Sequence, residues 1–195
     1  MFDSKKIRQA YSSPMAKANS PGGNVKLLNF TAAAVNRSDR VAILVGEGVN
    51  GAGVKTIYHQ LVAYGALPCL VDCNSERPVI TEYIDLNVDQ CVSTSRATVY
   101  EAIVIPDGDA FAKNCQSNIS TLNFVRQEYN HCKPILAIGA ACLVLERSNI
   151  SSVLPSGLAD PSIIIGTSAQ LKKALAELNA MLPQCAFPLL GTTHK

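Results

Sequence analysis

Short runs of apolar residues alternate along the chain with segments whose apolar residues recur at helical spacing. The run VAILV (41–45) is rich in β-branched residues, and the glycine-rich GEGVNGAG follows it. The next segment, VKTIYHQLVAYG, has the apolar period of an amphipathic helix and ends at a glycine. This pattern predicts a buried strand, a loop and a helix.

The same alternation continues toward the C-terminus. Further buried strands are predicted in ALPCLVD, YEAIVIP, KPILAIG and SIIIGT, and further helices, most clearly, in ISTLNFVRQEYNH, AACLVLERS and SAQLKKALAELNAML. Ser168 is the predicted N-cap of the last helix. Residues 74–98 alternate weakly, with short extended pieces near Val79 and from Asn87 to Val92.

Strands that are apolar on both faces and alternate with helices are typical of a parallel sheet covered on both sides. We therefore predict a three-layer, flavodoxin-like α/β domain, mostly parallel, over residues 40–183. Residues 1–39 are rich in Ser, Asn, Ala, Lys and Pro without an apolar period, which predicts a linker or extended arm. Residues 184–195 are interpreted as a tail.

Composition and charge exclude several classes of protein. The 195 residues are 48% hydrophobic, 16% charged and 6% aromatic, with a formal net charge of +2. No basic face is evident, so nucleic acid is not expected as a partner. Apolar stretches such as 135–145 are much shorter than the roughly 20 residues that span a bilayer, so no membrane association is expected.

The cysteines indicate free thiols. They are seven in number and form no C-x-x-C pair, so a disulfide framework fits poorly. Most lie in apolar segments and are expected to be buried, whereas Cys115 lies in a polar stretch and is expected to be exposed. The chain as given is interpreted as cytoplasmic. A secreted parent protein is the alternative, and sequons would matter only there: Asn29, Asn36, Asn118 and Asn149.

The stretch PILAIGAACLVLE (134–146) has the layout of a nucleophile elbow, in which a strand turns sharply into a helix. Ligands of a parallel sheet bind outside the carboxyl ends of its strands. The candidate site therefore comprises the loops at 46–53, 106–110 and 139–142. The residue at the elbow itself is Gly139, which has no side chain.

These segments carry a resemblance to a known family. The stretches VAILVGEGVNGAGVKTIYHQLVAYGALP, YEAIVIPDGDAF, FVRQEYNHCKPILAIGAACLVLE and SIIIGTSAQLKKALAEL resemble the PfpI-type branch of the class I glutamine amidotransferase-like superfamily. Within that branch, VRQEYNHCKPILAIG is most similar to the C-terminal domain of large-subunit (clade 2) catalases. The resemblance covers roughly residues 40–180, about three quarters of the chain.

The resemblance implies a site without its reactive residues. Active PfpI-type proteins carry a cysteine at the elbow and a glutamate in the first strand-helix loop, and these positions correspond to Gly139 and, within a residue, Asn50. Glycine has no sulfur and neutral asparagine cannot take a proton. We therefore expect no catalytic residue, metal or cofactor, and a vestigial pocket formed by Asn50, Gly108, Gly139 and Ala140.

Other residues offer alternatives. Cys142 follows the elbow in the first helical turn, where a reactive thiol is conceivable, although packing is the simpler interpretation. Loop carboxylates at Glu47, Asp107 and Asp109 could act as acid and base, although solvated loop groups are commoner.

By resemblance, the expected function is that of a catalytically silent domain with a structural, stabilising or chaperone-like (holdase) role in the response to hydrogen peroxide stress. Its partners would be a haem-catalase core domain or other protein surfaces, and a parent protein, if any, would decompose hydrogen peroxide. One alternative is a free-standing small-molecule binder or sensor that uses the vacated elbow pocket. Another is a residual PfpI-type hydrolase or deglycase. The oligomeric state stays open.

Overall fold

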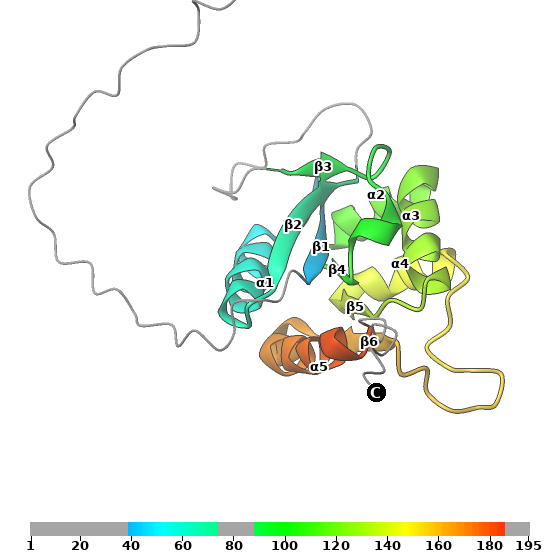
Figure 1. Cartoon of the computed structure of the whole chain (residues 1–195). Helices are drawn as coiled ribbons and strands as arrows, with labels where there is room; N and C mark the ends of the chain where they lie inside the picture. Colours follow the sequence, from blue (N-terminus) through cyan, green and yellow to red (C-terminus); the bar gives the residue numbers. More distant parts are fainter. Residues whose placement is uncertain (1–38, 74–87, 186–195) are drawn as a thin grey trace, which may run out of the picture. The chain divides into compact units, whose positions relative to one another are not determined.

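The computed structural model describes residues 39–73 and 88–185, in which parallel strands form one sheet (Figure 1). The strands are β1 (Arg40–Val45), β2 (Leu67–Asp72), β3 (Gln90–Cys91), β4 (Ala102–Ile105), β5 (Ile135–Ile138) and β6 (Ile163–Gly166). Their spatial order is β3-β2-β1-β4-β5-β6, and each pairing is parallel. Without the short edge strand β3, this is the order of a flavodoxin-like sheet, so the predicted fold class is confirmed.

Helices cover both faces of the sheet (Figure 1). They are α1 (Gly51–Ala63), α2 (Asp109–Ser117), α3 (Ile119–Asn130), α4 (Cys142–Arg147) and α5 (Leu171–Cys185), with single 3-10 turns η2 (Ala97–Val99), η3 (Gly139–Ala141) and η4 (Ser168–Gln170). Each face has its own apolar core. One core lies under α1 and α5, and the other lies under α2, α3 and α4.

The alternation of side chains along the strands divides residues between these two cores. In β1, Val41 and Ile43 pack with α1 and α5, whereas Ala42 and Leu44 pack with α2, α3 and α4. Because both faces are covered, a strand needs apolar residues at every position, which produces the continuous run VAILV. Fully burying one such side chain contributes roughly 1.5–3 kcal/mol to stability.

The segment between β4 and β5 forms two helices, of which the sequence clearly indicated the second. Asn118 separates them, and its Oδ1 accepts hydrogen bonds from the amides of Ser120 at 2.9 Å and Thr121 at 3.2 Å. The expectation that Cys115 is exposed is wrong. The inner face of α2 buries Cys115 together with Phe111, because the two are one helical turn apart.

The domain boundaries stay a prediction. Apart from Asp39, the arm expected over residues 1–39 lies outside the described residues, as do residues 186–195 and the extended piece near Val79. Helix α5 extends two residues past the expected boundary at 183. Within the described ranges, no helix is long and apolar enough to cross a membrane.

A carboxyl group is buried on the inner face of α3. Glu128 has an exposed fraction of 0%, and neither carboxyl oxygen has a hydrogen-bond partner within the described residues. Burial raises the pKa of Glu128 from its ordinary value of 4.5 to about 8, with Lys133 lowering and Glu101 raising it. At neutral pH the folded protein therefore holds this group as a neutral acid.

We predict that Glu128 makes the fold less stable as pH rises. Below about pH 4.5 the group is protonated in both states and there is no penalty. Between pH 4.5 and about 8 the unfolded chain releases the proton and the folded chain keeps it, so wild type loses up to about 1.4 kcal/mol per pH unit. Glu128→Gln removes this loss and should be the more stable protein at pH 8.

Urea unfolding of wild type and Glu128→Gln from pH 4.5 to 9 measures the effect. Glu177→Gln on the exposed face of α5 is the matched control and should follow wild type. Parallel pH profiles for wild type and Glu128→Gln would contradict the prediction.

Candidate functional site

The candidate site lies at the carboxyl ends of β1, β4 and β5. The chain enters the sheet at β1 and adds later strands on both sides of it, so the crossover direction reverses between β1 and β4. The loops after these strands bring together Asn50, Asp107 and Gly139, which are far apart in the sequence. The Asn50 amide donates a hydrogen bond to the backbone carbonyl of Asp107 at 2.9 Å, which joins the first two loops.

Gly139 forms the turn between β5 and the helix that follows. Its φ is +57°, a conformation that costs a non-glycine residue about 1–3 kcal/mol. A Cβ atom built on Gly139 would overlap the carboxylate of Asp107, with 2.7 Å to Oδ2 and even closer approaches to Oδ1 and Cγ. The space where an elbow residue would begin its side chain is therefore filled by Asp107.

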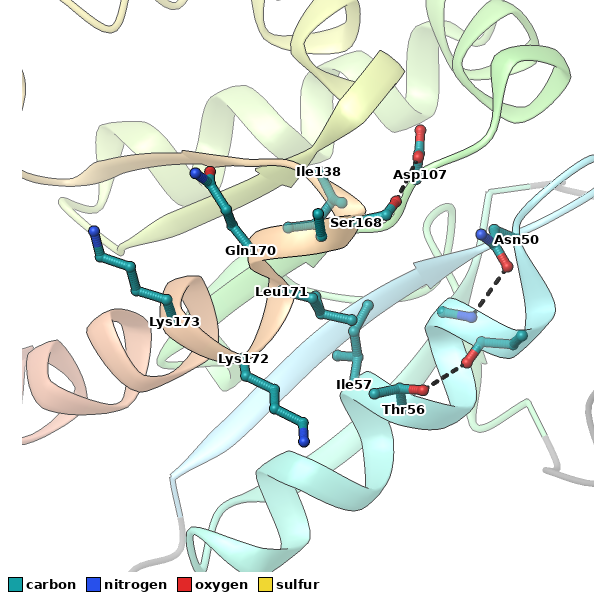
Figure 2. A pocket seen from close by; sticks show the side chains of 13 residues that line it. Asn50, Thr56, Ile57, Asp107, Ile138, Ser168, Gln170, Leu171, Lys172 and Lys173 are labelled. Carbon is teal, nitrogen blue, oxygen red and sulfur yellow. Dashed lines mark hydrogen bonds between the residues drawn. The ribbon is translucent and has the colours of Figure 1, made fainter.

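Three hydrogen bonds hold the Asp107 carboxylate in this position. Oδ1 accepts from the amides of Gly108 at 2.9 Å and Ala140 at 3.0 Å, and Oδ2 accepts from the Ser168 hydroxyl at 2.8 Å. Figure 2 shows the Ser168 hydroxyl directed at this carboxylate. Burial alone would raise the pKa of Asp107, but these hydrogen bonds outweigh it and hold the pKa below its ordinary value.

The predicted pocket residues converge on Asp107, each in a structural role. Gly108 and Ala140 supply amides to its carboxylate, and Gly139 leaves the room that it occupies. The side chain of Asn50 caps α1, because its Oδ1 accepts from the Gly53 amide at 3.1 Å. Gly108, Gly139 and Ala140 therefore surround the Asp107 carboxylate, whereas Asn50 is joined to the Asp107 backbone.

A cavity of about 610 Å³ lies beside this network, between the start of α1 and the start of α5 (Figure 2). Its lining includes Asn50 and Asp107 of the predicted site, but Gly108, Gly139 and Ala140 do not belong to it. The remaining lining residues are Ala52, Gly53, Thr56, Ile57, Ile138, Ser168, Ala169, Gln170, Leu171, Lys172 and Lys173. The open space is thus displaced toward α5 from the position of an elbow nucleophile.

Cys142, an alternative catalytic group, lies outside the cavity lining. Cys142 is half-buried at the start of α4, and burial raises the pKa of its thiol, with Glu146 and Asp107 adding to the rise against the opposing backbone amide. A raised pKa keeps the sulfur as the weakly nucleophilic thiol. Glu47 and Asp109 are exposed and lie outside the cavity lining. Among the residues described, no cluster of His, Cys, Asp and Glu could hold a metal ion.

Sequence reasoning missed Ser168 as a site residue. It was predicted as the N-cap of the last helix, but Thr167 takes the cap position before η4 and the Ser168 hydroxyl points to Asp107 instead. The prediction as an N-cap is wrong because Ser168 lies inside the turn η4 and not before it, and its hydroxyl donates a hydrogen bond to Asp107. The one sequence signal was the position of Ser168 just after a strand.

Comparison with solved structures identifies the fold. A mutant DJ-1 superfamily protein from Salmonella typhimurium matches 75% of this chain and 91% of its own, with a TM-score of 0.64 and 21% identity. Drosophila melanogaster DJ-1beta matches 77% of this chain and 96% of its own, with a TM-score of 0.63 and 14% identity. The domain therefore has the same fold as these DJ-1 proteins.

Comparison of sequences identifies the family. The pattern of the C-terminal domain found in long catalases matches residues 37–180, and the chain belongs to that family. It is 22% identical to Catalase-1 of Neurospora crassa over 138 residues and 25% identical to Catalase HPII of Mycobacterium avium over 146 residues. These matches cover 71% and 72% of this chain but 18% and 20% of the catalases, so the chain spans about one fifth of their length.

We predict that Gly139 and Asp107 are energetically coupled. Gly139→Ala introduces a strained φ and displaces the carboxylate, and should lower the free energy of unfolding by about 3 kcal/mol. Asp107→Ala alone loses three hydrogen bonds, but should cost far less in the Gly139→Ala background, where those bonds are already broken.

A double-mutant cycle by urea unfolding measures this coupling. Gly157→Ala is the control, because Gly157 has φ +83° and its added Cβ would meet nothing within 4 Å. It should cost only the backbone strain, about 1–2 kcal/mol. Additive effects of the Gly139 and Asp107 substitutions would show that the carboxylate does not depend on the glycine.

Proposed function

We propose that this domain is catalytically silent and that its role is structural, stabilising and chaperone-like. The observation that carries the proposal is the Asp107 carboxylate in the space of the elbow side chain, where it accepts hydrogen bonds from the Gly108 and Ala140 amides. In acyl-transfer enzymes, backbone amides beside the nucleophile stabilise the negative charge that develops on the substrate. Here a permanent negative charge of the chain itself takes these donors.

The remaining catalytic alternative finds little support. A hydrolase or deglycase would need a thiolate at Cys142, and burial favours the neutral thiol there. It would also need a base beside the sulfur. The Asp107 carboxylate accepts hydrogen bonds from three donors and has a lowered pKa. It is therefore a poor base.

Family membership supports a proposal about the parent protein and the partner of this domain. Because matched relatives are catalases several times longer than this chain, we propose that a parent protein decomposes hydrogen peroxide through a separate haem-catalase core, which this domain contacts and stabilises. A cytoplasmic location belongs to the same proposal. The free cysteines of the described ranges support it, because a reducing compartment preserves thiols.

Exposed apolar side chains support a role in protein contacts. The segment between α4 and β6 extends away from the sheet (Figure 1), and an antiparallel bridge between Val153 and Ala159 holds it together. On it, the exposed fractions of Val153 and Leu158 are 49% and 68%. Apolar groups that stay exposed in this way are suited to contact a partner or an unfolding client.

We predict that the chain suppresses aggregation of heated citrate synthase, measured by light scattering against an inert protein at equal molar excess. Replacing Val153 and Leu158 with serine should at least halve the suppression, because the exposed apolar contacts are lost. Absence of suppression by wild type would remove the chaperone-like part of the proposal.

The matched control replaces Val62 and Leu67 with serine. These two residues lie on α1 and β2, and their exposed fractions are 48% and 51%. Melting curves establish that each variant is folded. Equal loss of suppression in both double variants would show a non-specific effect of surface hydrophobicity and would contradict the assignment to the segment that carries Val153.

The cavity beside the elbow favours a second candidate function, the binding of a small molecule. It combines the apolar side chains of Ile57 and Ile138 with the polar groups of Thr56 and Gln170. Ligand sites in proteins share this combination of an apolar wall and a few polar groups. Such a ligand would stabilise the folded state by mass action.

We predict for this candidate that small carboxylates or phosphates raise the melting temperature in a concentration-dependent manner. Ala169→Trp, at the cavity lining, should abolish the shift by filling the space, whereas Ala180→Trp on the exposed face of α5 should retain it. If no compound of such a panel shifts the melting temperature of wild type, the small-molecule candidate is contradicted and only the structural role is left.

A further inference from the structure

Two buried cysteines from different elements meet on the face of the sheet covered by α2, α3 and α4. Cys73 follows the last residue of β2 and Cys115 lies on α2, and their sulfur atoms are 3.7 Å apart. Their exposed fractions are 4% and 1%. The two positions are separated by 42 residues of sequence, so this contact exists only in the folded chain.

The backbone around this pair is held from both sides. The Cys73 amide donates to the Val45 carbonyl at 2.9 Å, and the Cys73 carbonyl accepts from the Asn118 side-chain amide at 2.5 Å and from the Thr121 hydroxyl at 3.4 Å. Cys73 is thereby attached to the junction of α2 and α3. The attachment keeps the two sulfurs near each other while the domain stays folded.

Bond formation requires only a small movement. A disulfide has an S–S length of about 2.05 Å, so the sulfurs must approach by about 1.7 Å. The burial of both groups hinders the access of larger thiol reagents to either sulfur.

We propose that Cys73 and Cys115 form an oxidisable dithiol that a hydroperoxide converts into an intramolecular disulfide. One sulfur, as thiolate, attacks the peroxide, breaks its O–O bond and becomes a sulfenic acid, and the released hydroxide takes up a proton to form water. The second thiolate attacks that sulfur, breaks the S–O bond and releases a second hydroxide, which also becomes water. In total, two thiols and one hydrogen peroxide yield one disulfide and two waters, a two-electron oxidation of the protein.

The environment makes this reaction slow and selective. Burial raises the pKa of Cys73, the Cys115 thiol and the Asp72 carboxylate add to the rise, and the Thr121 hydroxyl opposes it. The reactive thiolate is therefore scarce at neutral pH. Oxidation then reports sustained exposure to peroxide. The disulfide would join the residue after β2 to α2, the helix whose N-cap residue is Gly108 of the elbow network.

The test uses the whole chain, reduced and then incubated with hydrogen peroxide under native conditions. Intact mass should fall by about 2 Da, and a peptide map should contain a dithiothreitol-reversible Cys73–Cys115 link. The link closes a long loop, so the melting temperature should rise by roughly 5–10 °C. A map in which Cys73 and Cys115 stay reduced after prolonged exposure, or join other cysteines, would overturn the proposal.

Variants supply the controls. Cys73→Ala and Cys115→Ala should each abolish both the link and the rise in melting temperature. Cys142→Ser and Cys132→Ser, which remove a half-buried and an exposed thiol, should retain both. The wild-type peptide map decides the question even where an alanine variant fails to fold. These chemical readouts are also independent of any chaperone-like activity.

Discussion

The carboxylate of Asp107, placed against the bare turn at Gly139, is the interaction on which the architecture of the candidate site depends. It connects the loops after β4 and β5 and the start of α5 through hydrogen bonds from Gly108, Ala140 and Ser168. Each donor stabilises the negative charge of the Asp107 carboxylate, which is partly removed from water. The hydrogen-bonded network and the glycine support each other, because any Cβ atom at residue 139 would expel the carboxylate.

This arrangement explains how the turn of an elbow can persist when its residue has no side chain. In a parallel sheet the strands end at one edge, where each chain turns sharply into a helix. The backbone amides of these turns need hydrogen-bond acceptors. In this chain the acceptor is internal, so the edge stays ordered without a substrate. The positive φ of Gly139 keeps the geometry of the elbow, and glycine makes that geometry inexpensive.

The core facing α2, α3 and α4 contains polar groups as well as apolar packing. Glu128 and Cys73 lie in this layer, where burial favours their neutral forms, and Cys115 is buried beside Cys73. The core under α1 and α5 consists of aliphatic side chains such as Val54 and Leu175. The two covered faces of the sheet therefore differ in the titratable groups that they bury, although the same strands form both.

By itself the sequence determined the fold class, since apolar runs such as VAILV are required wherever a strand is covered on both faces. It also indicated the elbow at Gly139, because the change from strand to helix period occurs there. Tertiary structure alone decided three contacts: the Asp107 carboxylate against Gly139, the hydrogen bond from Ser168 to that carboxylate, and the approach of Cys73 to Cys115. These contacts join residues from different strands and helices, and a local pattern contains no information on which side chains will share a space after the layers have packed.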